Sequence, residues 1–218
     1  MTTESNGRRA AGWLLIFATL SALLVMAHHP TIGSAGYDSL IDEVRSEAFL
    51  NRMVHGAMIV FTLCFYIGLK AHSDAVGRGH FLSRCADAAL AFATFTMIGA
   101  ALFSGFVTTE LAFRLDPQAD GSDALFRQML KVSYSGNQVL AKAGVLGYGA
   151  AIALTSVRLL TSTPRAWVVG SVGIVLGALL CAGIVGGSIS LHVQGMAMVL
   201  ALMALWFLGV GARMVRGA

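Results

Sequence analysis

Four of the six histidines fall near the same end of three long apolar segments, where an ionisable side chain is costly to bury. His28 and His29 follow the first segment, His55 lies about one turn inside the second, and His192 lies at a similar depth in the sixth. Imidazoles that meet at one depth from different helices are how helix bundles hold zinc, copper or haem iron. The sequence therefore predicts a shared ligand site, with His55 and His192 as leading ligands and His28 or His29 as a third.

Each of these segments also carries a methionine within one turn of its histidine. Met26 precedes His29 by three positions, and Met58 and Met196 follow the histidines of their own segments by three and four positions. Thioether sulfur beside imidazole suits copper in particular. A chain with 10 methionines also places some of them by packing alone, and no HxxH, HxxxH or HExxH spacing occurs. The pattern indicates haem b, copper or zinc as the bound group of a membrane redox protein, without choosing among them.

A second polar set lies on the fourth apolar segment. Tyr134, Gln138 and Lys142 recur at intervals of four residues, which predicts one polar stripe facing the protein interior. Glu110, at the outer end of the third segment, is the expected acidic partner of the lysine. Such a stripe lines a polar cavity, so a transporter or channel component for a small molecule or ion is an alternative function. An accessory subunit, whose polar residues meet a partner protein, is a further one.

The segments that position these residues dominate the composition. Of 218 residues, 56% are hydrophobic and only 12% are charged, with a mean hydropathy of +0.75, whereas soluble domains are about 25% charged. Segments of about 20 apolar residues can cross a hydrocarbon layer roughly 30 Å thick. We expect six spans, at about residues 10–27, 53–69, 86–107, 131–157, 166–186 and 190–211. The predicted fold is an all-α integral membrane protein, a bundle of six transmembrane helices in one domain that covers residues 1–218.

Two of the connections are long and partly helical in pattern. Between the first and second spans, apolar residues from Leu40 to Phe49 recur at three- and four-residue spacing among charged ones, which predicts an amphipathic helix on the outer face. Residues 123–131 show similar spacing and are expected to extend the fourth span outward. The two remaining histidines, His72 and His80, fall in the connection after the second span, where we expect solvated side chains.

Basic residues set the expected orientation, because positive charge near span ends is retained in the cytoplasm. Six spans place nine basic residues on the side of the termini: Arg8, Arg9, Lys70, Arg78, Arg84, Arg158, Arg165, Arg213 and Arg216. The opposite side carries five: Arg45, Arg52, Arg114, Arg127 and Lys131. Both termini are therefore expected to be cytoplasmic, in the inner (plasma) membrane of a bacterium. Because the basic residues are scattered singly, the net charge of +4 does not indicate a nucleic-acid partner.

Small residues complete the expectations about contacts. Gly173 and Gly177, and likewise Gly183 and Gly187, are spaced four apart and permit close contact between helices, either inside the chain or in a homodimer. The three cysteines show no metal-binding or disulfide spacing and are interpreted as packing residues. The lipid bilayer is the expected principal environment. No motif in the sequence fixes a substrate.

Overall fold

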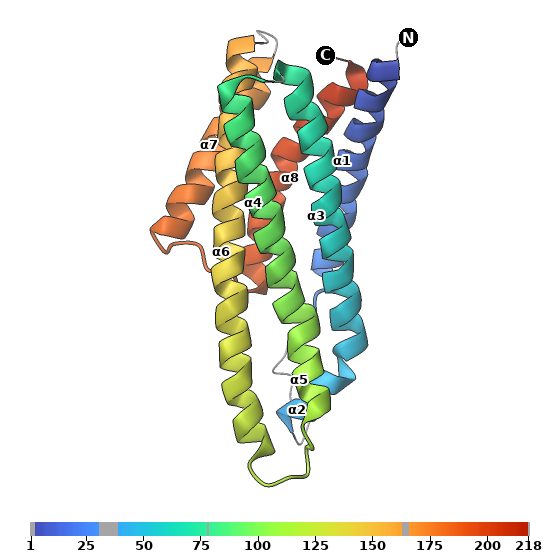
Figure 1. Cartoon of the computed structure of the whole chain (residues 1–218), viewed down its shortest axis with the longest axis vertical. Helices are drawn as coiled ribbons and strands as arrows, with labels where there is room; N and C mark the ends of the chain where they lie inside the picture. Colours follow the sequence, from blue (N-terminus) through green and yellow to red (C-terminus); the bar gives the residue numbers. More distant parts are fainter. Residues whose placement is uncertain (1–2, 31–38, 78, 163–165, 218) are drawn as a thin grey trace.

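The computed structural model describes residues 3–30, 39–77, 79–162 and 166–217, and within these ranges it contains helices and no strand (Figure 1). The elements are α1 (Thr3–Ala27), α2 (Leu40–Ser46), α3 (Ala48–Gly77), α4 (Phe81–Leu102), the π-helical turn η1 (Phe103–Val107), α5 (Thr108–Arg114), α6 (Ser122–Ser162), α7 (Trp167–Val185) and α8 (Val193–Arg216). The all-helical fold predicted from composition is confirmed.

Six helices among the described residues are long and apolar enough to cross a membrane, as predicted. They are α1, α3, the continuous rod of α4, η1 and α5, and then α6, α7 and α8. Several continue well past the apolar segment that marked them. The clearest case is α6, which begins at Ser122 and so includes the polar extension expected at residues 123–131. Polar residues at a helix end lower the mean hydropathy without ending the helix, so hydropathy alone underestimates the helix length.

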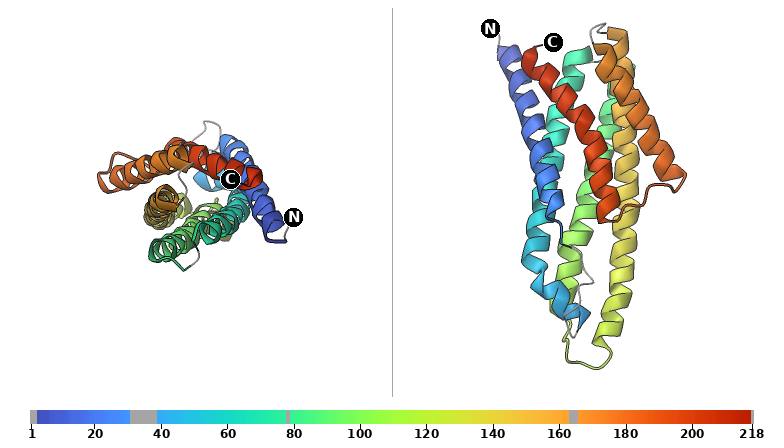
Figure 2. Two further views of the ribbon diagram at one scale, coloured as in Figure 1. Left: turned by 90° about the horizontal axis from the view of Figure 1, so that it is seen from above. Right: turned by 180° about the vertical axis from the view of Figure 1, so that it is seen from behind.

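The helices form one elongated bundle in which α1 packs on α3 and α8, α4 packs on α6, and α7 packs on the outer side of α6 (Figures 1 and 2). The start of α1 and the end of α8 lie at the same end of the bundle (Figure 1). At the other end α3, α5 and α6 continue past the ends of α1, α7 and α8 (Figure 2). This follows from length, because 41 residues of α6 extend about 60 Å whereas 19 residues of α7 extend about 28 Å.

The projecting end is closed by α2, at the place where an amphipathic helix was predicted. Ser39 caps it, accepting a hydrogen bond from the Asp42 N–H at 3.1 Å. Ile41 and Val44 are buried against Ala112 of α5 and Phe126 of α6, which form a second small core. The helix is shorter than its apolar pattern, because the chain turns at Glu47 and the last apolar positions of the pattern begin α3.

The glycines of α7 pack inside the chain. A Cβ at Gly173 would lie 2.0 Å from Ser156 Oγ, and one at Gly177 would lie 2.4 Å from the Gly149 carbonyl oxygen. A Cβ at Gly183 would lie 2.4 Å from Ile189, and Gly187 serves a turn with φ of +71°. At Gly173, Gly177 and Gly183 the close contacts are therefore made within the chain. Gly187 is exposed and has open space around it, and the homodimer considered through these four glycines stays a prediction.

Candidate functional site

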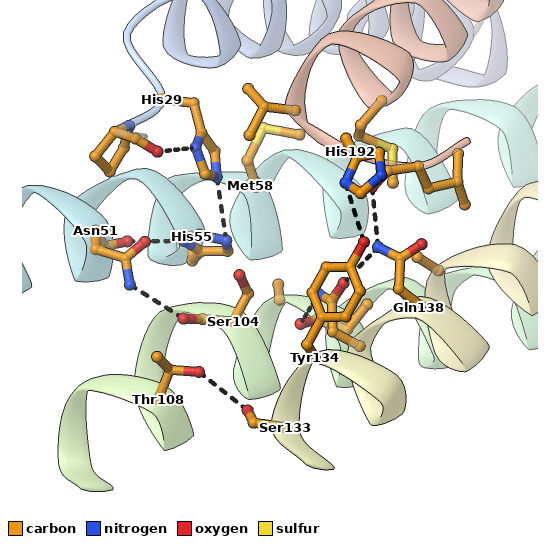
Figure 3. Close-up of a pocket in the computed structure, with 18 of the residues that line it drawn as sticks. His29, Asn51, His55, Met58, Ser104, Thr108, Ser133, Tyr134, Gln138 and His192 are labelled. Carbon is orange, nitrogen blue, oxygen red and sulfur yellow. Dashed lines mark hydrogen bonds between the residues drawn. The ribbon is translucent and has the colours of Figure 1, made fainter. Parts of the chain in front are cut away.

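A cavity of about 660 Å³ lies between α3, α4, α6 and the facing ends of α1 and α8 (Figure 3). Its lining contains three histidines and four methionines: His29, His55, His192, Met26, Met58, Met97 and Met196. Tyr134 and Gln138 also line it. Seven of the residues singled out from the sequence as ligands or cavity residues thus meet around one space: His29, His55, His192, Met58, Met196, Tyr134 and Gln138.

Two of the histidines are in direct contact. The Nε2 atoms of His29 and His55 are 3.4 Å apart, and the rings meet edge to face with centroids 4.9 Å apart (Figure 3). His29 follows the end of α1, and His55 lies in the second turn of α3, with only 7% of its surface exposed. The structure therefore pairs His55 with His29, whereas the sequence had suggested His55 and His192 as the leading pair.

The hydrogen bonds of the opposite ring nitrogens fix where the protons lie. His29 Nδ1 is 2.7 Å from the Pro30 carbonyl oxygen, and His55 Nδ1 is 2.9 Å from that of Asn51. A carbonyl oxygen only accepts, so each Nδ1 must donate its hydrogen. Burial lowers the pKa of His29, an effect that the Pro30 bond opposes, so this ring is neutral at pH 7. With the hydrogen of each ring placed on Nδ1, the two nitrogens that lie 3.4 Å apart are the ones without a hydrogen.

The position of His55 depends on an unusually close approach of the next helix. A Cβ at Gly105, in η1, would lie 2.3 Å from the His55 Cβ and 2.6 Å from its Cγ. Only glycine permits this contact. The helix opens into a π turn at this point, and π turns inside α-helices are frequent at functional sites.

Side chains donate hydrogen bonds to two carbonyl groups of the π turn, those of Phe103 and Ser104. Asn51 Nδ2 donates to the Ser104 carbonyl oxygen at 3.0 Å, beside the backbone of His55's own turn. Thr108 Oγ1 and Ser133 Oγ both donate to the Phe103 carbonyl oxygen, at 3.0 and 3.3 Å. These hydrogen bonds connect α3 and α6 to η1 beside His55, so they help to hold the helices around this histidine in place.

A different wall of the cavity carries His192, which precedes α8. Its Nδ1 is 3.0 Å from the Tyr134 hydroxyl, and the two rings stack with an interplanar angle of 17° (Figure 3). Gln138 donates its amide N–H to the Leu191 carbonyl oxygen at 3.0 Å. The wall therefore joins α6 to the chain segment that enters α8. Both rings are exposed at the rim of the cavity, with Tyr134 48% exposed.

Two predicted cavity residues lie elsewhere. Lys142 is exposed and does not line the cavity, and Ala141 occupies the inner position instead. Steps of four residues drift by about 40° each around a helix of 3.6 residues per turn, so Lys142 is turned about 80° from Tyr134. Glu110 is also exposed, where its carboxylate pairs with Arg114 at 3.0 Å and with Arg52 at 3.7 Å.

Two other histidines also differ from expectation. His28 is exposed, donates its Nδ1 hydrogen to the Leu24 carbonyl oxygen at 2.9 Å, and does not line the cavity. His72 is not solvated, because α3 continues to Gly77 and leaves this ring only 1% exposed. Neither of its ring nitrogens has a hydrogen-bond partner among the described residues. His80 is exposed, as expected, and caps the start of α4.

Sequence reasoning missed several residues that shape the site. Asn51, one turn before His55, supplies both the carbonyl group for the ring and the amide for the π turn. Met97 and Asn137 line the cavity from α4 and α6, and Asn137 donates to the Ala100 carbonyl oxygen at 2.8 Å. Polar residues one turn from a buried histidine were the available signal. Nothing in the sequence signalled the π turn.

The arrangement offers a metal ion two imidazole nitrogens and several thioethers. Among the described residues no group of three or more His, Cys, Asp and Glu side chains could hold a metal ion. A metal at His29 and His55 would therefore complete its coordination with sulfur, backbone oxygen or solvent. Figure 3 shows Met58 beside His29, on the same side of the cavity as the pair.

Comparison with known proteins adds no assignment to this geometry. The chain matches no protein-family model, no curated protein and no solved structure.

Proposed function

We propose that the protein is a membrane-embedded copper-binding protein with a redox function, and that His29 and His55 hold the ion. The observation that carries this proposal is that the Nε2 atoms of His29 and His55 lie 3.4 Å apart, while the Nδ1 atom of each ring donates its hydrogen to a carbonyl group. Two imidazole nitrogens bound to one tetrahedral ion at about 2.0–2.1 Å lie roughly 3.4 Å apart. The carbonyl groups provide the outer hydrogen bonds that orient metal-bound histidines.

Copper fits the surroundings better than zinc or haem does. Met26 and Met58 line the same cavity as the pair, and thioether sulfur is a soft ligand that selects Cu⁺. Copper alternates between Cu⁺ and Cu²⁺, whereas zinc has no redox chemistry. Two axial ligands of a haem approach the iron from opposite faces of the macrocycle. His29 and His55 meet edge to face at 4.9 Å, so no porphyrin fits between them in this arrangement.

We further propose that the six apolar helices are inserted in a plasma membrane with both termini on the cytoplasmic side. The excess of basic residues at the terminal end of the bundle supports this orientation. The cavity then lies in the outer half of the bundle, where α1 and α7 end and α6 projects into water. The alternative of a transporter cavity is weakened, because Lys142 and Glu110 do not line it.

The test is a metal titration of the purified protein in detergent after treatment with a chelator. We expect about one Cu⁺ per chain, measured in competition with a chromophoric copper ligand. His29→Ala and His55→Ala should each weaken binding by at least about a hundredfold, since a two-imidazole site loses half of its nitrogen ligands. His28→Ala is the matched control and should bind as the parent does. Gel filtration and thermal unfolding establish that each variant is folded.

Other outcomes would contradict the proposal in recognisable ways. A Soret band in the purified protein would indicate haem. Zinc bound in preference to Cu⁺ would remove the redox function. Binding of no metal would contradict the copper site and would favour the transporter or the accessory subunit.

A further inference from the structure

The cavity is much larger than a metal ion requires. A water molecule occupies about 30 Å³ in the liquid, whereas this cavity measures about 660 Å³ and falls within the range of small-molecule sites. The histidine pair occupies only one side of it. Tyr134, His192 and Gln138 lie on a different wall, across the space from His55 (Figure 3).

That second wall has hydrogen-bonding atoms that the protein does not use. The amide nitrogen of Gln138 donates to the Leu191 carbonyl oxygen and to Asn137. The side-chain carbonyl oxygen of Gln138 has no partner among the described residues. His192 bonds Tyr134 through Nδ1, and no hydrogen bond to its Nε2 occurs in the described part of the chain. A ligand oxygen placed here can therefore donate to or accept from this wall.

Apolar side chains of the lining suit a flat apolar ring. The cavity lining also includes Met97 and Met196 and the small side chains of Ala100, Ala101 and Ala141. Methionine sulfur makes favourable contacts with aromatic rings, and alanine leaves a smooth wall. The lining contains one acidic residue, Glu47, and one basic residue, Lys131, so it does not select for a net charge.

The rim of the cavity lies where a ligand could arrive from the bilayer. Residues 186–192 connect α7 to α8 at the level where these shorter helices end, while α6 continues past them (Figure 2). Exposed Tyr134 and His192 stand at this rim. With the proposed insertion, the rim meets the outer edge of the hydrocarbon layer, where an amphiphilic molecule keeps its tail in lipid and its head at the interface.

We propose that the cavity binds the headgroup of a lipid-soluble quinone or quinol. Such a ring is neutral and flat, carries oxygen at opposite ends and bears an apolar tail. A quinone oxygen would accept a hydrogen bond from the Tyr134–His192 pair, and a quinol hydroxyl in the same place could donate to the Gln138 carbonyl oxygen. The oxygen at the other end of the ring would point toward the histidine pair. The inference deepens the proposed function by naming the ligand class of the same cavity, but binding of the ring does not itself require the metal.

The test uses a short-chain photoreactive azidobenzoquinone as the probe, on the full chain in lipid nanodiscs after removal of metal. After illumination, mass spectrometry locates the label, with and without excess decylbenzoquinone as competitor. We expect saturable labelling at residues 134–141 or 191–196. Tyr134→Phe and His192→Ala should each weaken the competition by about tenfold, the effect of one lost hydrogen bond to a buried ligand. Tyr66→Phe and His28→Ala, which lie outside the lining, should not.

The outcomes separate this inference from the copper site. Unsaturable label spread over the lipid-facing helices would mean that the quinone only partitions into the bilayer, and it would overturn the inference. Equal competition in Tyr134→Phe, His192→Ala and the parent would overturn it too. Saturable labelling in a protein that binds no copper would support the quinone site and reject the copper site. Copper binding without saturable labelling would do the reverse.

Discussion

Replacing Gly105 by alanine tests whether the close contact between η1 and His55 positions this histidine. The new Cβ would start 2.3 Å from the His55 Cβ, whereas carbon atoms in contact prefer about 3.5–4.0 Å. Either the ring or the π turn must therefore move by more than 1 Å. Ligands must be held within about 0.5 Å of their productive positions, so we expect copper affinity to fall at least tenfold. Overpacking of this kind costs about 1–3 kcal/mol.

Gly56→Ala provides the matched control, because Gly56 is the residue next to His55 and its new Cβ would find Phe106 at an ordinary 3.8 Å. Both substitutions replace glycine inside a helix and gain up to about 1 kcal/mol of helix propensity. The difference between the variants isolates the clash. Thermal unfolding in detergent and copper titration are measured for both. If Gly105→Ala unfolds and binds copper as Gly56→Ala does, the reasoning about the close approach is wrong.

The other predictions concern residues outside the site. Lys142→Met should leave copper affinity unchanged in the titration, because the side chain is exposed and does not line the cavity; a tenfold loss would place it inside. His72→Leu should keep or raise the free energy of unfolding, since neither buried ring nitrogen has a hydrogen bond among the described residues. A decrease in that free energy of more than about 1 kcal/mol would mean that the ring has an essential partner. In a chain whose native cysteines are changed to serine, Asp120→Cys should react with an impermeant thiol reagent from outside and His80→Cys should not, and the opposite result would invert the proposed orientation.

The helices were predictable because their signal is local. A run of about 20 apolar residues predicts a long apolar helix whatever the positions of the neighbouring helices. The helix α2 was predictable from the spacing of apolar residues such as Ile41 and Val44. Helix ends were less predictable. Extensions such as the start of α6 at Ser122 and the end of α3 at Gly77 are polar, and hydropathy does not register them. The burial of His72 was missed for this reason.

The sequence allowed the depth of each candidate histidine in the bundle to be predicted, but not the direction in which its side chain points. Distance along a helix gives the depth of a residue, and in the structure His29, His55 and His192 line one cavity. It does not tell which helix each side chain faces, because that depends on the order of the helices in the bundle. The pairing of His55 with His29 follows from α1 packing on α3 and from the approach permitted by Gly105. No sequence pattern encodes either one.

The central claim is that His29 and His55 share one metal ion, and X-ray absorption at the copper edge tests it most directly. On protein loaded with one equivalent of Cu⁺, we predict two imidazole nitrogen neighbours at about 2.0 Å and at least one sulfur neighbour. The imidazole signal should be lost in the His29→Ala/His55→Ala double variant and retained in His28→Ala. A spectrum without imidazole scattering, or one unchanged in the double variant, would contradict the account.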